Sequence, residues 1–247
     1  MARNDVGVRT EPGQPILLAL DSAGSGCSVV VGAGETVLAA ERCATARGQA
    51  EMLLPLVDVV MRRSGLSRLA LDIVGATVGP GSFTGIRVGL ATALGIALAT
   101  GVRPVGVTSF EAVAAGLSRE VREWGASFLL VALESRREEL YIQLFDHASC
   151  PAGDPMGALP AALGETLKGL IGGASLVVGG DAAQRAASVL LPRADTIVTK
   201  GSAPDAAGLL RAVLGRASRR EGSLKPSPVY LRPPDVTVSS AYQRAMR

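Results

Sequence analysis

Residues 79–90 read GPGSFTGIRVGL and join a glycine-rich turn to the start of an apolar helical pattern. The apolar run 73–78 before this turn predicts a buried strand, and the helical pattern continues to about Ala99. Ser82 or Thr84 can cap the helix by accepting a hydrogen bond from a free backbone N–H group. Such a turn brings N–H groups to a sheet edge, where an anion or a partner's polar group can dock. The alternative is a tight turn that binds no ligand, because a glycine turn alone is a weak signal.

Strand and helix patterns alternate on both sides of this turn. The ranges predicted in the first half are strands 16–20, 27–31, 36–41, 73–78 and 104–107, and helices 50–63, 82–99 and 109–117. A second unit begins near Trp124 with paired strands at 128–133 and 140–145. An irregular stretch, 146–160, is followed by further helices and strands to Arg219. The prediction is an α/β fold.

The composition allows a large aliphatic core. The chain has 247 residues, of which 48% are hydrophobic but only 3% aromatic, so Ala, Val, Leu and Ile must build the interior. The net charge of +3 does not by itself argue for nucleic acid. Cys27, Cys43 and Cys150 form no C-x-x-C pair, which predicts free thiols in a reducing compartment.

The sequence predicts neither a signal peptide nor a membrane span. Residues 1–15 lack the apolar centre of a signal peptide and are predicted as a disordered leader. The most apolar window, 88–102, has about 15 residues, too few to cross a bilayer. We therefore expect a cytoplasmic protein that does not contact a membrane.

Two small-residue turns indicate a nucleotide cleft. Asp21 ends the first strand before a Ser/Gly turn, and Gly179-Gly180-Asp181 forms a second turn in the other half. The residues assigned to this cleft, which we regard as vestigial, are Asp21, Ser22, Gly79, Gly81, Ser82 and Asp181. The alternative is two simple turns with Asp21 bonded to nearby backbone, since no lysine-bearing phosphate loop is present.

No residue set predicts catalysis or a metal site. The chain has one histidine, His147, and a two-histidine metal site cannot be built from it. Ser82 does not lie in a G-x-S-x-G motif, so a helix cap is the better reading of this serine. The charged segment 134–139 is interpreted as a solvated turn in which Glu134, Glu138 and Glu139 pair with Arg136 and Arg137.

Small residues recur every four positions along the helix after the glycine turn. They are Gly85, Gly89, Ala93 and Ala97. A smooth stripe of this kind lets another helix approach closely. The stripe can face a partner protein, or it can pack on the chain's own sheet.

Five segments carry a family resemblance. They are Leu18–Ser22, Glu51–Pro55, Val78–Thr108, Arg136–Tyr141 and Pro228–Arg232. Together they resemble the TsaB (YeaZ) family, partner proteins in the threonylcarbamoyladenosine modification of tRNA, from about Ile16 to Arg232. Residues 79–89 are the specific part of the match.

The resemblance implies a fold and a domain division. TsaB proteins are similar to the actin-like ATPase (ribonuclease H-like) superfamily, so two lobes with mixed sheets flanked by helices are expected. The implied division is an N-terminal lobe at 16–118, a C-terminal lobe at 119–232 and a flexible tail at 233–247.

The resemblance also implies a non-catalytic function. TsaB proteins bind and activate TsaD, which transfers threonylcarbamoyl to adenosine 37 of tRNAs that read ANN codons, and the ATPase TsaE joins the assembly. The helices at 50–63 and 82–99 would pair with those of TsaD in a heterodimer, or with those of a second copy. tRNA would be reached only through the complex, and no cofactor is expected beyond a nucleotide at the partner interface. The implied interface residues are Leu53, Leu56, Val60, Gly85, Gly89, Ala93 and Ala97.

Several positions depart from the family patterns. TsaD proteins carry two metal-binding histidines that align near Ser109 and Val113, and neither residue ligates as an imidazole does. Family members often carry His at Gln49 and usually Asp at Glu134, which leaves the roles of these two positions open.

Two other functions stay open. One is an autonomous nucleotide-dependent kinase or ATPase that uses Asp21, Gly81 and Asp181, which ATP turnover by the lone protein would support. The other is a glycoprotease-like metallopeptidase, against which the single histidine argues.

Overall fold

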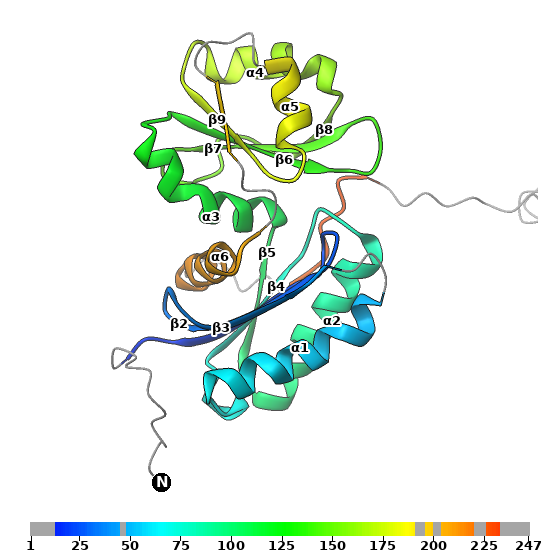
Figure 1. Cartoon of the computed structure of the whole chain (residues 1–247), viewed down its shortest axis with the longest axis vertical. Helices are drawn as coiled ribbons and strands as arrows, with labels where there is room; N and C mark the ends of the chain where they lie inside the picture. The colour runs from blue at the N-terminus through cyan, green and yellow to red at the C-terminus, as the bar shows by residue number, and fades with distance from the viewer. Residues whose placement is uncertain (1–12, 45–47, 191–195, 200–203, 220–225, 233–247) are drawn as a thin grey trace, which may run out of the picture.

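The computed structural model describes residues 13–44, 48–190, 196–199, 204–219 and 226–232, with two sheets and their helices stacked in layers (Figure 1). The predicted tail, 233–247, and residues 1–12 of the predicted leader lie outside the described residues. Residues 13–15 correct the leader prediction, because the Pro15 carbonyl accepts a hydrogen bond from the Gly34 N–H at 2.9 Å.

The first sheet mixes antiparallel and parallel strands. Its strands are β1 (Ile16–Asp21), β2 (Cys27–Ala33), β3 (Thr36–Cys43), β4 (Ile73–Thr77) and β5 (Arg103–Val107), in the order β3-β2-β1-β4-β5. The strands β1, β2 and β3 pair antiparallel, whereas β4 and β5 continue from β1 in parallel. The central strands read as nearly continuous apolar runs because helices cover both faces.

The second sheet repeats this topology. Its strands are β6 (Phe128–Glu134), β7 (Leu140–Asp146), β8 (Met156–Ala158), β9 (Leu176–Gly179) and β10 (Thr196–Val198), in the order β10-β9-β6-β7-β8. Here β6, β7 and β8 pair antiparallel, and β9 and β10 continue from β6 in parallel. The sequence missed β8 inside the stretch predicted as irregular, because its three largely exposed residues show no alternation.

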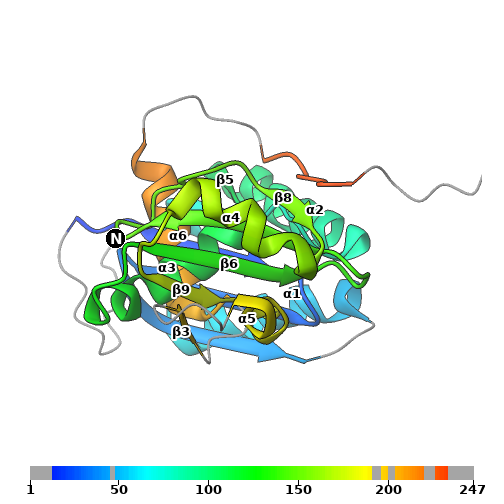
Figure 2. The same ribbon diagram turned by 90° about the horizontal axis from the view of Figure 1, so that it is seen from above.

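Helices cover the outer and inner faces of both sheets. The outer face of the first sheet carries α1 (Gln49–Ser64) and α2 (Phe83–Thr100), with the short η1 turn (Arg68–Ala70) after α1. The outer face of the second sheet carries α4 (Leu163–Ile171) and α5 (Ala183–Leu190), with η2 (Pro160–Ala162) before α4. Figure 2 shows α4 and α5 lying over the second sheet.

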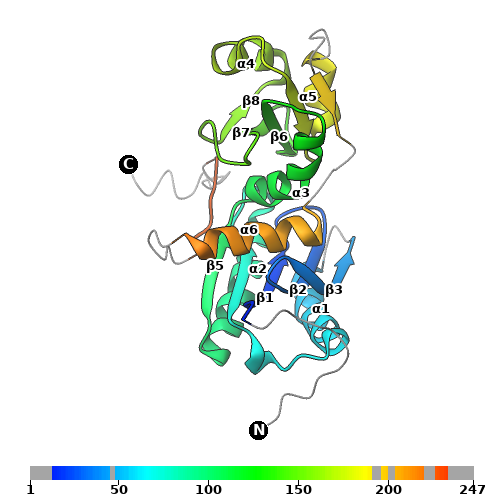
Figure 3. The ribbon, with the colours of Figure 1, turned by 90° about the vertical axis from the view of Figure 1, so that its left-hand side faces the viewer.

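Two helices fill the space between the sheets. The helix α3 (Ser109–Glu123) packs on the second sheet, and α6 (Ala206–Ser218) packs on the first, side by side with α3 (Figure 3). An ideal Cβ at Gly75 of β4 would lie 2.3 Å from the Val213 side chain of α6, so this strand position needs glycine. The chain therefore returns to the first sheet late in the sequence, and the lobe division at 118/119 stays a prediction.

The segment Pro226–Arg232, here called the C-terminal strap, contacts both lobes. The Val229 N–H donates a hydrogen bond to the Val78 carbonyl at 2.7 Å, in the first lobe. Leu231 packs against the α3 cluster, and Arg232 forms an ion pair of 2.7 Å with Glu139 after β6. The strap thus fastens the two sheets to each other.

Candidate functional site

A cavity of about 120 Å³ lies between the turns of the two sheets. Its lining residues are Asp21, Ala23–Ser28, Arg42, Pro80, Gly81, Ser109, Leu133, Glu134, Asp181 and Pro204. Among the residues predicted for a nucleotide cleft, Asp21, Gly81 and Asp181 line this one cavity, and their role in binding a nucleotide stays a prediction. Ser22, Gly79 and Ser82 do not line it.

Asp21 is held at the end of β1 by local hydrogen bonds. Its Oδ1 atom accepts a bond from the Thr77 hydroxyl at 2.6 Å and another from the Ala23 N–H at 3.0 Å. Burial raises the pKa of this carboxyl above its ordinary value, although both hydrogen bonds and the charge of Arg42 act in the opposite direction. The local bonding expected if Asp21 binds no ligand is thus present.

The glycine-rich turn interlocks with the turn after β1. The Ser82 N–H donates to the Ala23 carbonyl at 2.7 Å, and an ideal Cβ at Gly81 would lie only 2.2 Å from that carbonyl oxygen. Ser82 also caps α2, since its Oγ accepts from the Gly85 N–H at 3.2 Å. Of the two caps predicted, Ser82 is therefore the one that forms.

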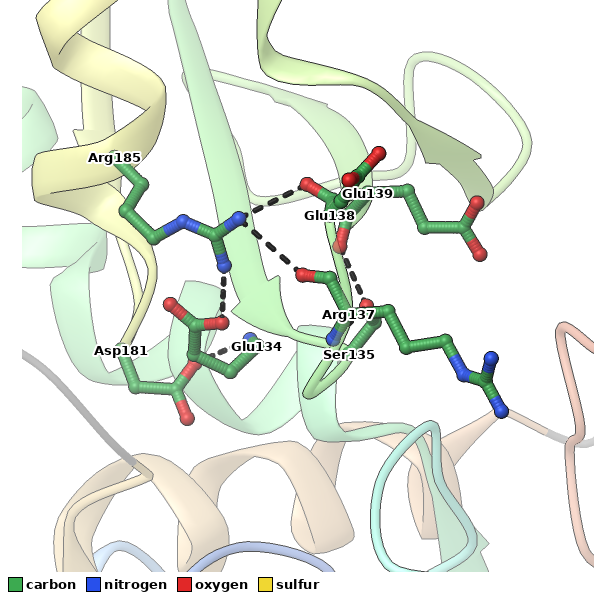
Figure 4. Close-up of polar contacts among 7 residues, drawn as sticks. All are labelled: Glu134, Ser135, Arg137, Glu138, Glu139, Asp181 and Arg185. Atoms are coloured by element: carbon green, nitrogen blue, oxygen red, sulfur yellow. Dashed lines mark hydrogen bonds and ion pairs between the residues drawn. The ribbon is translucent and has the colours of Figure 1, made fainter.

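Glu134 and Asp181 line the cavity from the second sheet, and polar contacts join them to the hairpin turn after β6 and to α5 (Figure 4). The Glu134 N–H donates to Oδ1 of Asp181 at 2.9 Å, and Arg185 of α5 forms an ion pair of 2.5 Å with the Glu134 carboxylate. Arg185 also donates to the carbonyls of Glu138, at 2.9 Å, and Arg137, at 3.3 Å. One guanidinium thus ties the hairpin turn after β6 to α5.

These contacts correct the expected pairing of the charged turn. Glu134 pairs with Arg185 and Glu139 pairs with Arg232, rather than either pairing with Arg136 or Arg137. The acidic partners lie in β6 or its turn, and the arginines come from distant parts of the chain, so sequence spacing gave no signal of these pairs.

The described lining of the cavity is acidic. Withdrawal of the Asp181 carboxyl from water raises its pKa, and the negative charge of Glu134 acts in the same direction. Among the described residues, the cavity lining carries three carboxyl groups, Asp21, Glu134 and Asp181, and one guanidinium, Arg42.

No metal-binding cluster of three or more His, Cys, Asp or Glu side chains occurs among the described residues. Ser109 and Val113, where the resemblance places the histidines of TsaD proteins, have structural roles. The Ser109 hydroxyl donates to the Pro80 carbonyl at 2.9 Å, and Val113 is buried against the second sheet. His147 lies exposed in the turn after β7.

The residues expected at a partner interface are buried inside this chain. They are Leu53, Leu56, Val60, Gly85, Gly89, Ala93 and Ala97. An ideal Cβ at Gly85 would lie 1.9 Å from the Ser22 carbonyl oxygen, and one at Gly89 would lie 2.6 Å from the Ser22 Oγ. The small stripe therefore packs within the chain's own fold, which was the alternative interpretation, and all seven residues are buried.

The outward side of the same two helices exposes several large apolar side chains. We call it the α1–α2 face, and its large exposed apolar residues are Met52, Leu54, Phe83, Leu94 and Leu98. Leu98 is 88% exposed and Leu54 is 54% exposed. Beside the leucines of α2, Gly95 has no atom within 4 Å of an ideal Cβ, so this part of the helix is open.

The composition of α2 explains why the sequence did not separate these two faces. Apolar residues occur on every side of this helix, and a helix of this kind gives little amphipathic signal of which face is buried. Within the described part of the chain, α2 alone has the length and composition of a membrane span, with 18 residues and a mean hydropathy of 1.5. Its buried residues pack on the first sheet as those of a core helix do.

Gln49 joins the start of α1 to the cavity. Its side-chain amide donates to the carbonyls of Gly26, at 2.9 Å, and Gly24, at 3.1 Å. The first residue of α1 thus fixes the turn that lines the cavity.

Known proteins are similar to this chain over most of its length. The sequence model of the family described as "TsaD: tRNA N6-adenosine threonylcarbamoyltransferase" matches residues 11–149. The TsaB protein of Escherichia coli is 35% identical over 126 residues, which are 51% of this chain and 52% of that protein. The match therefore spans about half the length of that curated relative. An uncharacterized protein of Mycobacterium tuberculosis is 30% identical over 224 residues, 89% of this chain and 92% of that protein.

Solved structures agree with the predicted fold. A Pseudomonas aeruginosa protein described as similar to peptidase YeaZ has a TM-score of 0.71 at 25% identity, covering 88% of this chain and 100% of that chain. A ROK hexokinase of Thermus thermophilus has a TM-score of 0.51 at 15% identity, covering 81% and 97%. The second likeness shows the fold alone, and it confirms the actin-like architecture of two mixed sheets flanked by helices. The family match over more than half of the chain, the TsaB relatives and the YeaZ-like structure together show that the chain belongs to the TsaB (YeaZ) family.

Proposed function

We propose that this chain is a non-catalytic partner that binds and activates a TsaD-type transferase, which forms threonylcarbamoyladenosine at adenosine 37 of tRNAs reading ANN codons. Its curated relatives are named as tRNA threonylcarbamoyladenosine biosynthesis proteins. The single observation that carries the proposal is the exposed apolar α1–α2 face, with Leu98 at 88% exposure.

The α1–α2 face has the properties of a helix-packing surface. Burying one leucine side chain in an interface removes apolar area worth about 1.5–3 kcal/mol from water. The open position at Gly95, next to Leu94 and Leu98, allows a partner helix to approach the α2 backbone closely. The interface residues we propose are therefore the exposed Met52, Leu54, Leu94 and Leu98. They replace the seven buried residues of α1 and α2 that the sequence predicted.

The cavity supports a non-catalytic assignment for the chain itself. The described residues of its walls carry more carboxylates than cations, and Asp21 accepts hydrogen bonds from Thr77 and Ala23. Asp21, Gly81 and Asp181 are then remnants of a nucleotide cleft.

The wider assembly follows from the same proposal. A TsaE-like ATPase joins the heterodimer in the cytoplasm, tRNA is reached only through the complex, and a nucleotide can lie at the partner interface. In the absence of the transferase, the same apolar face supports a homodimer. No membrane contact is required.

Reconstitution tests this function. The chain is purified with the TsaD-type and TsaE-type proteins of its own organism, and threonylcarbamoyladenosine is measured in tRNA with and without the chain. Modification that depends on the chain supports the proposal. Modification at the same rate in its absence would contradict it.

The cavity also supports a second candidate function, that of an autonomous nucleotide-dependent kinase or ATPase. The observation that favours it is the meeting of Asp21, Gly81 and Asp181 at one cavity. Phosphate release by the isolated chain with Mg-ATP, lost in Asp181→Asn, would establish this candidate. Equal background rates for both proteins would dismiss it.

A further inference from the structure

Cys27 and Cys43 lie directly opposite each other in the first sheet. They are register partners in the antiparallel pairing of β2 with β3. Residues opposite each other in such a ladder have Cα atoms about 4.5 or 5.5 Å apart, depending on the hydrogen-bonding position. Disulfides join Cα atoms about 4.4–6.8 Å apart, so either position fits one.

Both sulfurs lie on the face of the sheet that α1 and α2 cover. Cys27 belongs to the core cluster under these helices, and Cys43 packs against the same cluster. Glu41, two residues before Cys43 and therefore on the same side of β3, forms an ion pair with Arg63 of α1. The two thiols thus point to one side of the sheet.

The two cysteines differ in their access to solvent. Cys27 is 2% exposed, whereas Cys43 is partly exposed at the end of β3. Burial raises the pKa of the Cys27 thiol, and the neighbouring Cys43 acts in the same direction. Cys43 is therefore the thiol that a solute meets first, and Cys27 is the one that resolves the reaction.

We propose that Cys27 and Cys43 are an oxidation site that closes to an intramolecular disulfide on exposure to peroxide. The Cys43 sulfur attacks hydrogen peroxide, an S–O bond forms, the O–O bond breaks and water leaves. The Cys27 sulfur then attacks the sulfenic sulfur, the S–S bond forms and the S–O bond breaks. The Cys27 thiol proton leaves with the hydroxide as a second water. Two thiols and one peroxide give one disulfide and two waters.

The disulfide would fasten the wall of the cavity next to the start of α1. Gly26, adjacent to Cys27, is packed so closely on β3 that an ideal Cβ there would lie 2.5 Å from the Cys43 carbonyl oxygen. The Gly26 carbonyl accepts the Gln49 hydrogen bond at the first residue of α1. The oxidised chain therefore links β2 to β3 covalently beside the turn 24–26, and Gln49 at the start of α1 is held to that turn by hydrogen bonds.

The test uses the full chain in a Cys150→Ala background, because Cys150 is exposed and would form mixed products. The protein is treated with hydrogen peroxide, and peptide mapping under non-reducing conditions locates any crosslink. We expect a Cys27–Cys43 peptide pair that has lost two hydrogen atoms. We also expect thermal unfolding to shift upward by about 5–10 °C and to return after reduction.

Cys43→Ser is the matched variant, since this partly exposed position tolerates serine better than the buried Cys27. The crosslink and the temperature shift should both be absent in it. Free thiols at both positions after treatment would overturn the proposal. So would sulfinic acid at Cys43 without a crosslink, or disulfide-linked dimers through Cys43.

Discussion

The Ser22 hydroxyl donates a hydrogen bond of 2.8 Å to the Gly85 carbonyl, which ties the turn after β1 to the first turn of α2. The contact is buried, and it brings the Ser22 backbone against the small-residue stripe of α2. It explains why this stripe serves the chain's own fold and why the surface available to a partner is the opposite side of the helix.

Gly85→Ala should destabilise the fold strongly. An ideal Cβ at this position lies 1.9 Å from the Ser22 carbonyl oxygen, so the backbone must move to admit a methyl group. We expect a loss of about 3 kcal/mol in the free energy of unfolding, measured by urea denaturation. Gly95→Ala is the matched control, because its Cβ meets nothing within 4 Å and alanine favours the helix by about 1 kcal/mol. Equal stability of the two variants would contradict this packing.

Asp21→Asn should stabilise the chain at neutral pH but not in acid. Burial raises the pKa of Asp21 in the folded state above its ordinary value of 3.8, so the folded chain holds this proton more tightly than the unfolded chain does. The free energy of unfolding therefore falls as the pH rises from 3.8 through the raised pKa of the folded state. At any higher pH the full cost of the buried charge remains. Asparagine keeps the acceptor oxygen for Thr77 and Ala23 without the charge.

The measurement for Asp21 is the difference in unfolding temperature between variant and wild type across an acid-to-neutral titration. The variant's advantage should be present at neutral pH and should shrink as the pH falls. An advantage that is constant with pH, or a loss at neutral pH, would show that the Asp21 carboxylate does not carry the cost of burial.

Arg185→Ala should loosen the hairpin turn that follows β6. The guanidinium pairs with Glu134 and donates to the carbonyls of Arg137 and Glu138, and its side chain is 39% exposed, so solvent weakens the pair. We expect a loss of about 1–2 kcal/mol in unfolding free energy, with faster proteolysis in residues 135–139. Glu134→Gln should cost less, because both carbonyl contacts persist. A larger loss in Glu134→Gln than in Arg185→Ala would assign the stabilisation to the charge pair alone.

Much of the site could be predicted where local patterns dictate it. The turn at Gly79–Ser82, the cap of α2 and the approach of Gly81 to Asp21 at the end of β1 follow from strand ends and glycine turns. These features depend on short-range geometry, because the ends of neighbouring strands lie at the same edge of a sheet.

Long-range packing could not be predicted in the same way. The helix α6 has an apolar face, but nothing in its pattern says that it covers the first sheet rather than the second. Glu134 pairs with Arg185 of α5, which lies 51 positions away in the sequence. The burial of Gly85 and Gly89 instead of Leu94 and Leu98 depends on the contact with Ser22, which helical spacing does not reveal.

The most direct test of the proposed function is the affinity of the TsaD-type transferase for Leu98→Asp, measured by isothermal titration calorimetry. Leu170→Asp on α4 is the control, since it changes an exposed leucine of a helix on the second lobe. The account predicts that wild type and Leu170→Asp bind alike, whereas Leu98→Asp binds about 10–100-fold more weakly, because a leucine leaves the interface and a charge enters it. Unchanged affinity of Leu98→Asp, or the absence of any complex with the wild-type chain, would contradict it.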